Sequence, residues 1–133
     1  SVHVHAVDGT IPVYWEAPLA PPKGILLALH GCQHAGSEFW PPSAECAHCL
    51  ELPEEARIRR LALDRGFVFV TVDSADRTSG CWGLEDVGRL ARAVEHVRSA
   101  ARAGPLPLVV FGASSGGAMA LELPLRDFKV AAV

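Results

Sequence analysis

Short apolar runs alternate along the chain with stretches of helical periodicity, a pattern typical of layered α/β domains. Three runs are apolar on both faces, as expected of central parallel strands that helices cover on each side, and they span residues 24–30, 67–73 and 106–111. Between them the spacing predicts helices over residues 53–65, which Gly66 ends, and 84–103. The order of elements therefore predicts a mostly parallel central sheet flanked by helices.

Both ends of the chain add extended segments. Residues 2–7 and 10–17 flank the turn signal Asp8-Gly9 and predict a hairpin. Pro12 favours an edge position for the second of these strands. Residues 128–133 predict another strand, and because nothing follows to pair with it, we expect an open sheet edge that favours self-association.

Composition narrows the class of protein. The 133 residues are 50% hydrophobic and 20% charged, which fits one ordered domain over residues 1–133 and excludes a disordered chain. The net charge of −3 gives no basic face for nucleic acid, and no apolar run reaches the length of a membrane span. No N-terminal signal peptide is visible, which slightly favours a cytoplasmic location.

One motif carries candidate chemistry. The run Gly112-Ala113-Ser114-Ser115-Gly116 matches G-x-S-x-G between a predicted strand and a helix that ends at Pro124, which is the context that a nucleophile elbow requires. Ser114 would occupy a strained turn with its hydroxyl directed outward, and side chains at Gly112 or Gly116 would collide with neighbouring elements. The free N–H of Ser115 at the helix start is then a candidate oxyanion donor.

A second motif closes the strand at residues 24–30. In His30-Gly31-Cys32, Gly31 allows the backbone to approach the site closely, and the N–H of Cys32 (or of Gln33) is the second candidate oxyanion donor.

With these two motifs in this order, the chain resembles the N-terminal half of an α/β-hydrolase. It is most similar to esterases of the polyhydroxybutyrate depolymerase and feruloyl esterase type, which carry a similar His-Gly-Cys turn. The resemblance implies Ser114 as the nucleophile of a serine esterase, an acyl-enzyme formed from a small carboxylic ester, and neither cofactor nor metal. It also implies that His30 and Gly31 support the oxyanion loop.

The chain departs from the family in its acid and base. In this fold Asp or Glu and then His follow the nucleophile, whereas only Glu122 and Asp127, and no His, follow Ser114. We therefore expect the fold to be truncated after the strand that follows the elbow, and activity to need a longer chain that supplies Asp and His. Of the upstream histidines, His30 is expected to be structural and His96 to be solvated or packed.

The loops leave several interpretations open. Trp40 and Trp82 follow the carboxyl ends of parallel strands, where they would either wall a substrate pocket or cover the edge of the core. Cys46 and Cys49 allow a disulfide with each other or of one of them with Cys81, free thiols, or a zinc site completed by His34 or Cys81.

Two other functions compete with the esterase. One is a non-catalytic, truncated hydrolase-like domain that binds a partner through its exposed sheet edge. The other is a nucleotide-binding domain of the short-chain dehydrogenase kind, whose glycine-rich turn resembles residues 112–117. That turn belongs after the first strand, however, and Ala118 stands where its last glycine would be.

Overall fold

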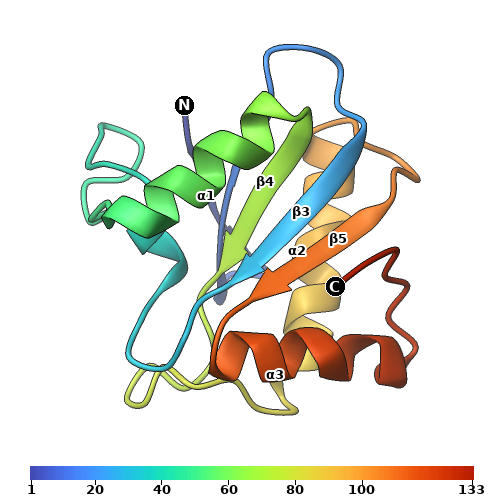
Figure 1. The fold of residues 1–133 in the computed structure, drawn as a ribbon. Coiled ribbons are helices and arrows are strands. Elements are labelled where there is room, and N and C mark those ends of the chain that lie inside the picture. The colour runs from blue at the N-terminus through green and yellow to red at the C-terminus, as the bar shows by residue number, and fades with distance from the viewer.

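The computed structural model describes all 133 residues and contains one five-stranded sheet in the order β1-β2-β4-β3-β5. Strands β3 (Gly24–Leu29), β4 (Phe67–Val72) and β5 (Leu108–Gly112) run parallel to one another. The hairpin β1 (His3–Val7) and β2 (Ile11–Glu16) joins the sheet antiparallel to β4. The mostly parallel sheet and its N-terminal hairpin are therefore confirmed (Figure 1).

Helices cover the sheet on both faces. Helix α1 (Pro53–Asp64) lies on one face, while α2 (Asp86–Ala100) lies on the other (Figure 1). Helix α3 (Ser115–Glu122) starts directly after β5 and packs with α2 in the same apolar cluster. Two short 3-10 helices, η1 (Gly36–Phe39) and η2 (Leu123–Arg126), complete the structure.

The alternation of side chains along β3 divides the core into two layers. Ile25 and Leu27 are fully buried in the cluster that includes α2 and α3 residues, whereas Ala28 belongs to the cluster on the α1 side. This two-sided burial explains why the central strands are continuously apolar.

The predicted edge position of the strand that contains Pro12 is wrong, because β2 lies between β1 and β4. Pro12 lies just before the four residues of β2 that pair with β4, and on that side it uses only its carbonyl, which accepts from Asp73 N–H at 3.2 Å. The carbonyl of Asp73, which a residue other than proline would bond in return, instead accepts from Arg89 Nη1 at 2.9 Å.

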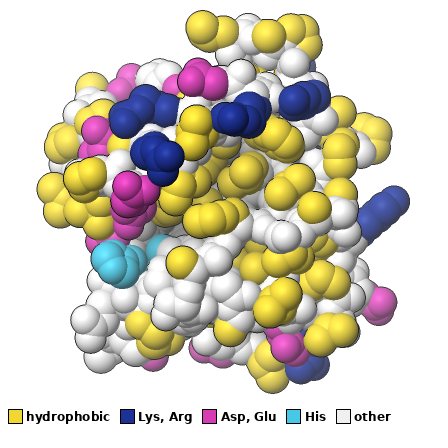
Figure 2. Space-filling model, in the orientation of Figure 1, with side chains coloured by type: hydrophobic (Ala, Val, Ile, Leu, Met, Phe, Trp, Pro, Cys, Tyr) yellow, Lys and Arg dark blue, Asp and Glu magenta, His cyan; other side chains and the backbone are white.

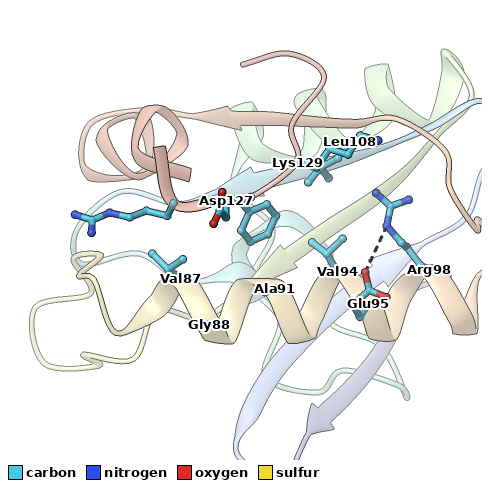
Figure 3. A pocket seen from close by; sticks show the side chains of 11 residues that line it. Val87, Gly88, Ala91, Val94, Glu95, Arg98, Leu108, Asp127 and Lys129 are labelled. Atoms are coloured by element: carbon cyan, nitrogen blue, oxygen red, sulfur yellow. Dashed lines mark ion pairs between the residues drawn. The ribbon is translucent and has the colours of Figure 1, made fainter. Parts of the chain in front are cut away.

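The predicted strand over residues 128–133 is also wrong. Asp127 has a left-handed backbone (φ 58°), and the chain beyond it meets β5 only at one parallel bridge between Val109 and Ala132. Between α2 and this segment lies a cavity of about 330 Å³, with Val94 and Lys129 among its lining residues (Figure 3). Self-association through this edge stays a prediction.

One part of the sheet has no helix over it. In Figure 1, β3 and β5 lie open beside α1, and in Figure 2 hydrophobic side chains gather on that face. The alternation along β5 directs Val109 and Phe111 to this side, and Phe111 is 40% exposed. The apolar side chains here lack the cover that helices provide elsewhere. No helix of the chain has both the length and the apolar character that a bilayer span requires.

Two glycine-to-alanine substitutions test how the helices begin and end. Gly66→Ala should lower the free energy of unfolding by about 1–2 kcal/mol, because Gly66 follows α1 with φ +86°. Gly88→Ala should raise it by about 0.5–1 kcal/mol, because Gly88 lies exposed inside α2 with room for a methyl group. Urea unfolding measures both, and a shift of the same sign in the two variants would contradict the assigned helix boundaries.

Candidate active site

Ser114 occupies a sharp turn between β5 and α3. Its backbone has φ 56° and ψ −125°, a combination that costs a non-glycine residue about 1–3 kcal/mol. A Cβ on Gly112 would overlap the backbone of Gly116, and one on Gly116 would overlap the carbonyl of Leu29. The two flanking glycines are thus required by close backbone contact, and the exposed Ser114 side chain projects from the turn.

The turn after β3 lies directly beside this elbow. A Cβ on Gly31 would lie 3.9 Å from the Cβ of Ser114, so the two loops are in close contact at this glycine. Gln33 N–H donates to the carbonyl of Ser79 at 2.7 Å, whereas no acceptor in the protein bonds Cys32 N–H. Ser115 is the first residue of α3, so its N–H has no intrahelical acceptor. Of the two candidates after Gly31, only Cys32 therefore offers a free amide.

His30 lies behind this loop, 4% exposed, and both ring nitrogens have partners. Nδ1 donates to the carbonyl of Gly31 at 2.8 Å, and Nε2 accepts from Ser74 N–H at 3.2 Å. Burial lowers the pKa of His30 below its ordinary value, although the bond to Gly31 opposes this in part. The neutral ring thus holds two loops together and has no free nitrogen with which to act as a base.

Trp82 connects the turn after β3 to the elbow. Its indole Nε1–H donates to the carbonyl of His30 at 2.7 Å, and its backbone N–H donates to Ser115 Oγ at 2.9 Å. It also lines a cavity of about 420 Å³ together with Ser115 and Met119. Trp82 is therefore available to a ligand beside the elbow.

Trp40 does not share this position, and of its two open interpretations the structure agrees with cover for the edge of the core. It is 2% exposed, its ring packs against Phe69, and its Nε1–H donates to Glu16 at 2.8 Å. The loop after β3 folds back over the α1 side of the sheet, so that Trp40 fills the second core layer.

All four cysteines form disulfides, Cys32 with Cys81 and Cys46 with Cys49. Of the open interpretations, only the pairing of Cys46 with Cys49 agrees with the structure, and the free thiols and the zinc site do not. The bond from Cys32 to Cys81 was not expected, and it ties the oxyanion loop to the segment that carries Trp82.

A buried carboxylate that sequence reasoning missed organises the same segment. Asp86 is fully buried and accepts from Ala75 N–H at 2.8 Å and from Gly83 N–H at 2.9 Å, and it pairs with Arg89 at 2.7 Å. These bonds hold both ends of the loop after β4. The available signal was an aspartate in the first turn of an amphipathic helix, where carboxylates commonly bind free amides.

No acid or base of the chain is hydrogen-bonded to Ser114. Its Oγ makes no hydrogen bond; Glu122 pairs with Arg126 at 2.7 Å, and Asp127 is exposed at the end of η2. His96 is on α2, packed against His5 with ring centroids 4.8 Å apart. None of these residues therefore acts as an acid or base for Ser114 in this structure.

A serine at a strained strand-to-helix turn, beside a glycine turn from the neighbouring strand, defines the nucleophile elbow of the α/β-hydrolase fold. The glycine-rich turn follows the last of five strands, which contradicts the nucleotide-binding interpretation. No protein-family model matches the sequence. No curated protein matches it either.

Solved structures do match. An acetyl xylan esterase from Aspergillus awamori superposes with a TM-score of 0.70 at 21% identity, over 99% of this chain and 50% of its own. A highly thermostable carboxyl esterase from Bacillus coagulans (TM-score 0.66, 14% identity) matches over 98% of this chain and 42% of its own. A cold-adapted esterase from an Arctic intertidal metagenomic library (0.64, 20%) matches over 98% and 57%. The chain therefore has the α/β-hydrolase fold and spans about half the length of these structures.

The buried His30 ring makes stability depend on pH. Below about pH 6.5 the unfolded chain binds a proton at His30, whereas in the folded chain the lowered pKa keeps the ring neutral. The free energy of unfolding should therefore fall as the pH drops from about 7.5 toward the folded-state pKa. His30→Gln should be less stable at pH 7.5 and should lose much of this slope. Urea unfolding at several pH values measures it, and an equal slope in both proteins would contradict a buried, neutral His30.

Proposed function

We propose that the chain carries the nucleophile and the oxyanion hole of a serine esterase that acts on small carboxylic esters through an acyl-enzyme on Ser114. The observation that carries the proposal is the strained, exposed Ser114 beside two unpaired amides, those of Cys32 and Ser115. The names of the matching structures, which are esterases, support the same class of substrate.

In this proposal, Ser114 Oγ attacks the ester carbonyl carbon and gives up its proton, and the carbonyl oxygen becomes an oxyanion. The N–H groups of Cys32 and Ser115 donate to that oxygen, and the positive end of α3 adds to the stabilisation. The carbonyl then forms again as the bond to the alcohol oxygen breaks, and that oxygen takes up, through solvent water, the proton that Ser114 released. The acyl group stays on Ser114. Trp82, which lines the neighbouring cavity, is placed to contact the substrate.

We expect the 133 residues alone to be a slow enzyme. No His follows Ser114 in the sequence, so the usual base of the fold is not supplied from that side. Oxyanion donors and binding without a working triad retain about 10³-fold to 10⁴-fold acceleration over the uncatalysed reaction. A longer chain that adds Asp and His after residue 133 is expected to be much faster.

The two disulfides are informative about the cellular compartment of the protein. Stable disulfides are rare in the cytosol and common in secreted and periplasmic proteins. Because all four cysteines are paired, as Cys32–Cys81 and Cys46–Cys49, we propose an oxidising compartment in place of the cytoplasmic location that the sequence slightly favoured.

Covalent labelling tests the proposed nucleophile. Incubation with p-nitrophenyl acetate should add one acetyl group per chain, and peptide mapping should place it on Ser114, because this exposed hydroxyl lies at the start of α3 and beside the Gly31 turn. Ser114→Ala should abolish the adduct, whereas Ser99→Ala, at an exposed serine of α2, should leave it unchanged. An adduct of equal yield in wild type and Ser114→Ala would refute the proposal.

A further inference from the structure

Three side chains that can bind a metal ion converge beside the turn after β3. Ligand atoms of His34, Glu38 and Glu55 all lie within 4.8 Å of one another. Glu38 is part of η1 and His34 lies two residues before it, whereas Glu55 belongs to the first turn of α1. None of the three takes part in the proposed esterase chemistry, so their convergence needs a separate explanation.

The backbone already holds these residues in place. The carbonyl of Glu38 accepts from Leu52 N–H at 3.0 Å, and Leu52 directly precedes α1. His34 N–H donates to the carbonyl of Gly31 at 3.2 Å, and its carbonyl accepts from Arg77 Nη2 at 2.8 Å. An ion that binds here would therefore need to order side chains but no segment of backbone, which lowers the entropic cost of binding.

The negative charge of the group is only partly balanced within the protein. Nδ1 of His34 lies 2.6 Å from Glu38 Oε1, but the carboxylate of the half-buried Glu55 has no hydrogen bond and no ion pair. The arginines of α1 that form ion pairs do so with other glutamates: Arg57 with Glu54, and Arg59 with Glu16 and Glu51. A divalent cation among the three side chains would replace the repulsion between the two carboxylates with attraction to both.

We propose that His34, Glu38 and Glu55 bind a divalent transition-metal ion, with Zn²⁺ as the member of this class that they fit best. One imidazole nitrogen and two carboxylate oxygens are ligands that Zn²⁺ accepts, and a water completes its four-coordinate shell. Ca²⁺ and Mg²⁺ prefer oxygen ligands alone, so the histidine selects against them. In contrast to the zinc site that the sequence left open, no cysteine takes part, because all four form disulfides.

Binding requires one small movement. In a tetrahedral zinc site with bonds of about 2.0–2.1 Å, two ligand atoms lie roughly 3.3 Å apart. The 2.6 Å between His34 Nδ1 and Glu38 Oε1 is the length of a hydrogen bond, so the ring and the carboxylate must separate by less than about 1 Å. The His34 side chain is 46% exposed and is free to turn by this amount. The ion takes the place of the shared proton, which the ring then carries on Nε2.

A bound ion would tie the segment after β3 to the start of α1. The unfolded chain does not hold the three ligands together, and its cysteines remain in disulfides, so zinc binds the folded chain in preference. Zinc should therefore stabilise the fold as well as bind to it.

Isothermal titration with ZnCl₂ tests the proposal. One ion should bind per wild-type chain, and Glu55→Gln should weaken binding by at least about 10-fold to 100-fold, because even the loss of a residue that only supports a metal ligand costs this much. Glu54→Gln, at the exposed neighbouring position of α1, is the matched control and should bind like the wild type. His34→Gln should lose binding too, whereas His5→Ala, at an exposed histidine of β1, should not.

Two further readouts distinguish a metal site from a local ion pair. Zinc should raise the urea midpoint of the wild type and of Glu54→Gln, and leave that of Glu55→Gln unchanged. Co²⁺ should give visible absorption bands in the wild type that His34→Gln lacks. Far-UV circular dichroism without metal establishes that each variant is folded before the comparison.

Several results would overturn the proposal. Absence of saturable zinc binding to the wild type, or equal affinity in Glu55→Gln, would leave only an ion pair. Loss of binding in His5→Ala but not in His34→Gln would place the ion at the packed rings of His5 and His96 instead. Equal affinity for Ca²⁺ and Zn²⁺ would contradict a histidine ligand. None of these measurements uses an ester, so their outcome is independent of the proposed function.

Discussion

The proposed site depends on one close backbone contact between a helix and a strand. Helix α3 begins against the end of β3, where Gly116 meets the carbonyl groups of Leu29 and His30. A side chain at this position, or at Gly112, would push the helix away from the sheet. Because the helix starts so close, the backbone of Ser114 is forced into its strained conformation, and the free N–H groups at the start of α3 lie beside the turn after β3.

Around this contact, the loops are fixed by polar groups and a disulfide more than by apolar packing. The loop after β4 is held at both ends by the buried carboxylate of Asp86, and Cys81 and Trp82 connect it to the oxyanion loop and the elbow. His30 bonds the same two loops from behind. A site built on loops needs such support, because a shift of about 1 Å in an oxyanion donor is expensive for catalysis.

The sequence predicted correctly the features that depend on residues close together in the chain. Apolar periodicity located the three parallel strands and the long helices, and G-x-S-x-G located the elbow, because strand, glycine and helix start are neighbours in the chain. The wrong predictions concern distant contacts. Pro12 predicts an edge strand, whereas β2 lies between β1 and β4. Residues 128–133 predict a strand, although their approach to β5 is set by the turn at Asp127.

The same distinction explains what was missed at the site. The Cys32–Cys81 bond joins positions 49 residues apart, and the bond from the Trp82 indole to the carbonyl of His30 joins positions 52 residues apart. No pattern within a single segment contains this information. The folded structure adds the contacts between segments that lie far apart in the sequence, which no local motif contains.

A crystal structure of the chain after reaction with an alkyl fluorophosphonate tests the central claim most directly. The account predicts a phosphorus bonded to Ser114 Oγ and one phosphonyl oxygen about 2.7–3.1 Å from the amide nitrogens of both Cys32 and Ser115. A phosphonyl oxygen that points to solvent, with both amides unoccupied, would contradict the oxyanion hole and with it the reason for the strained turn.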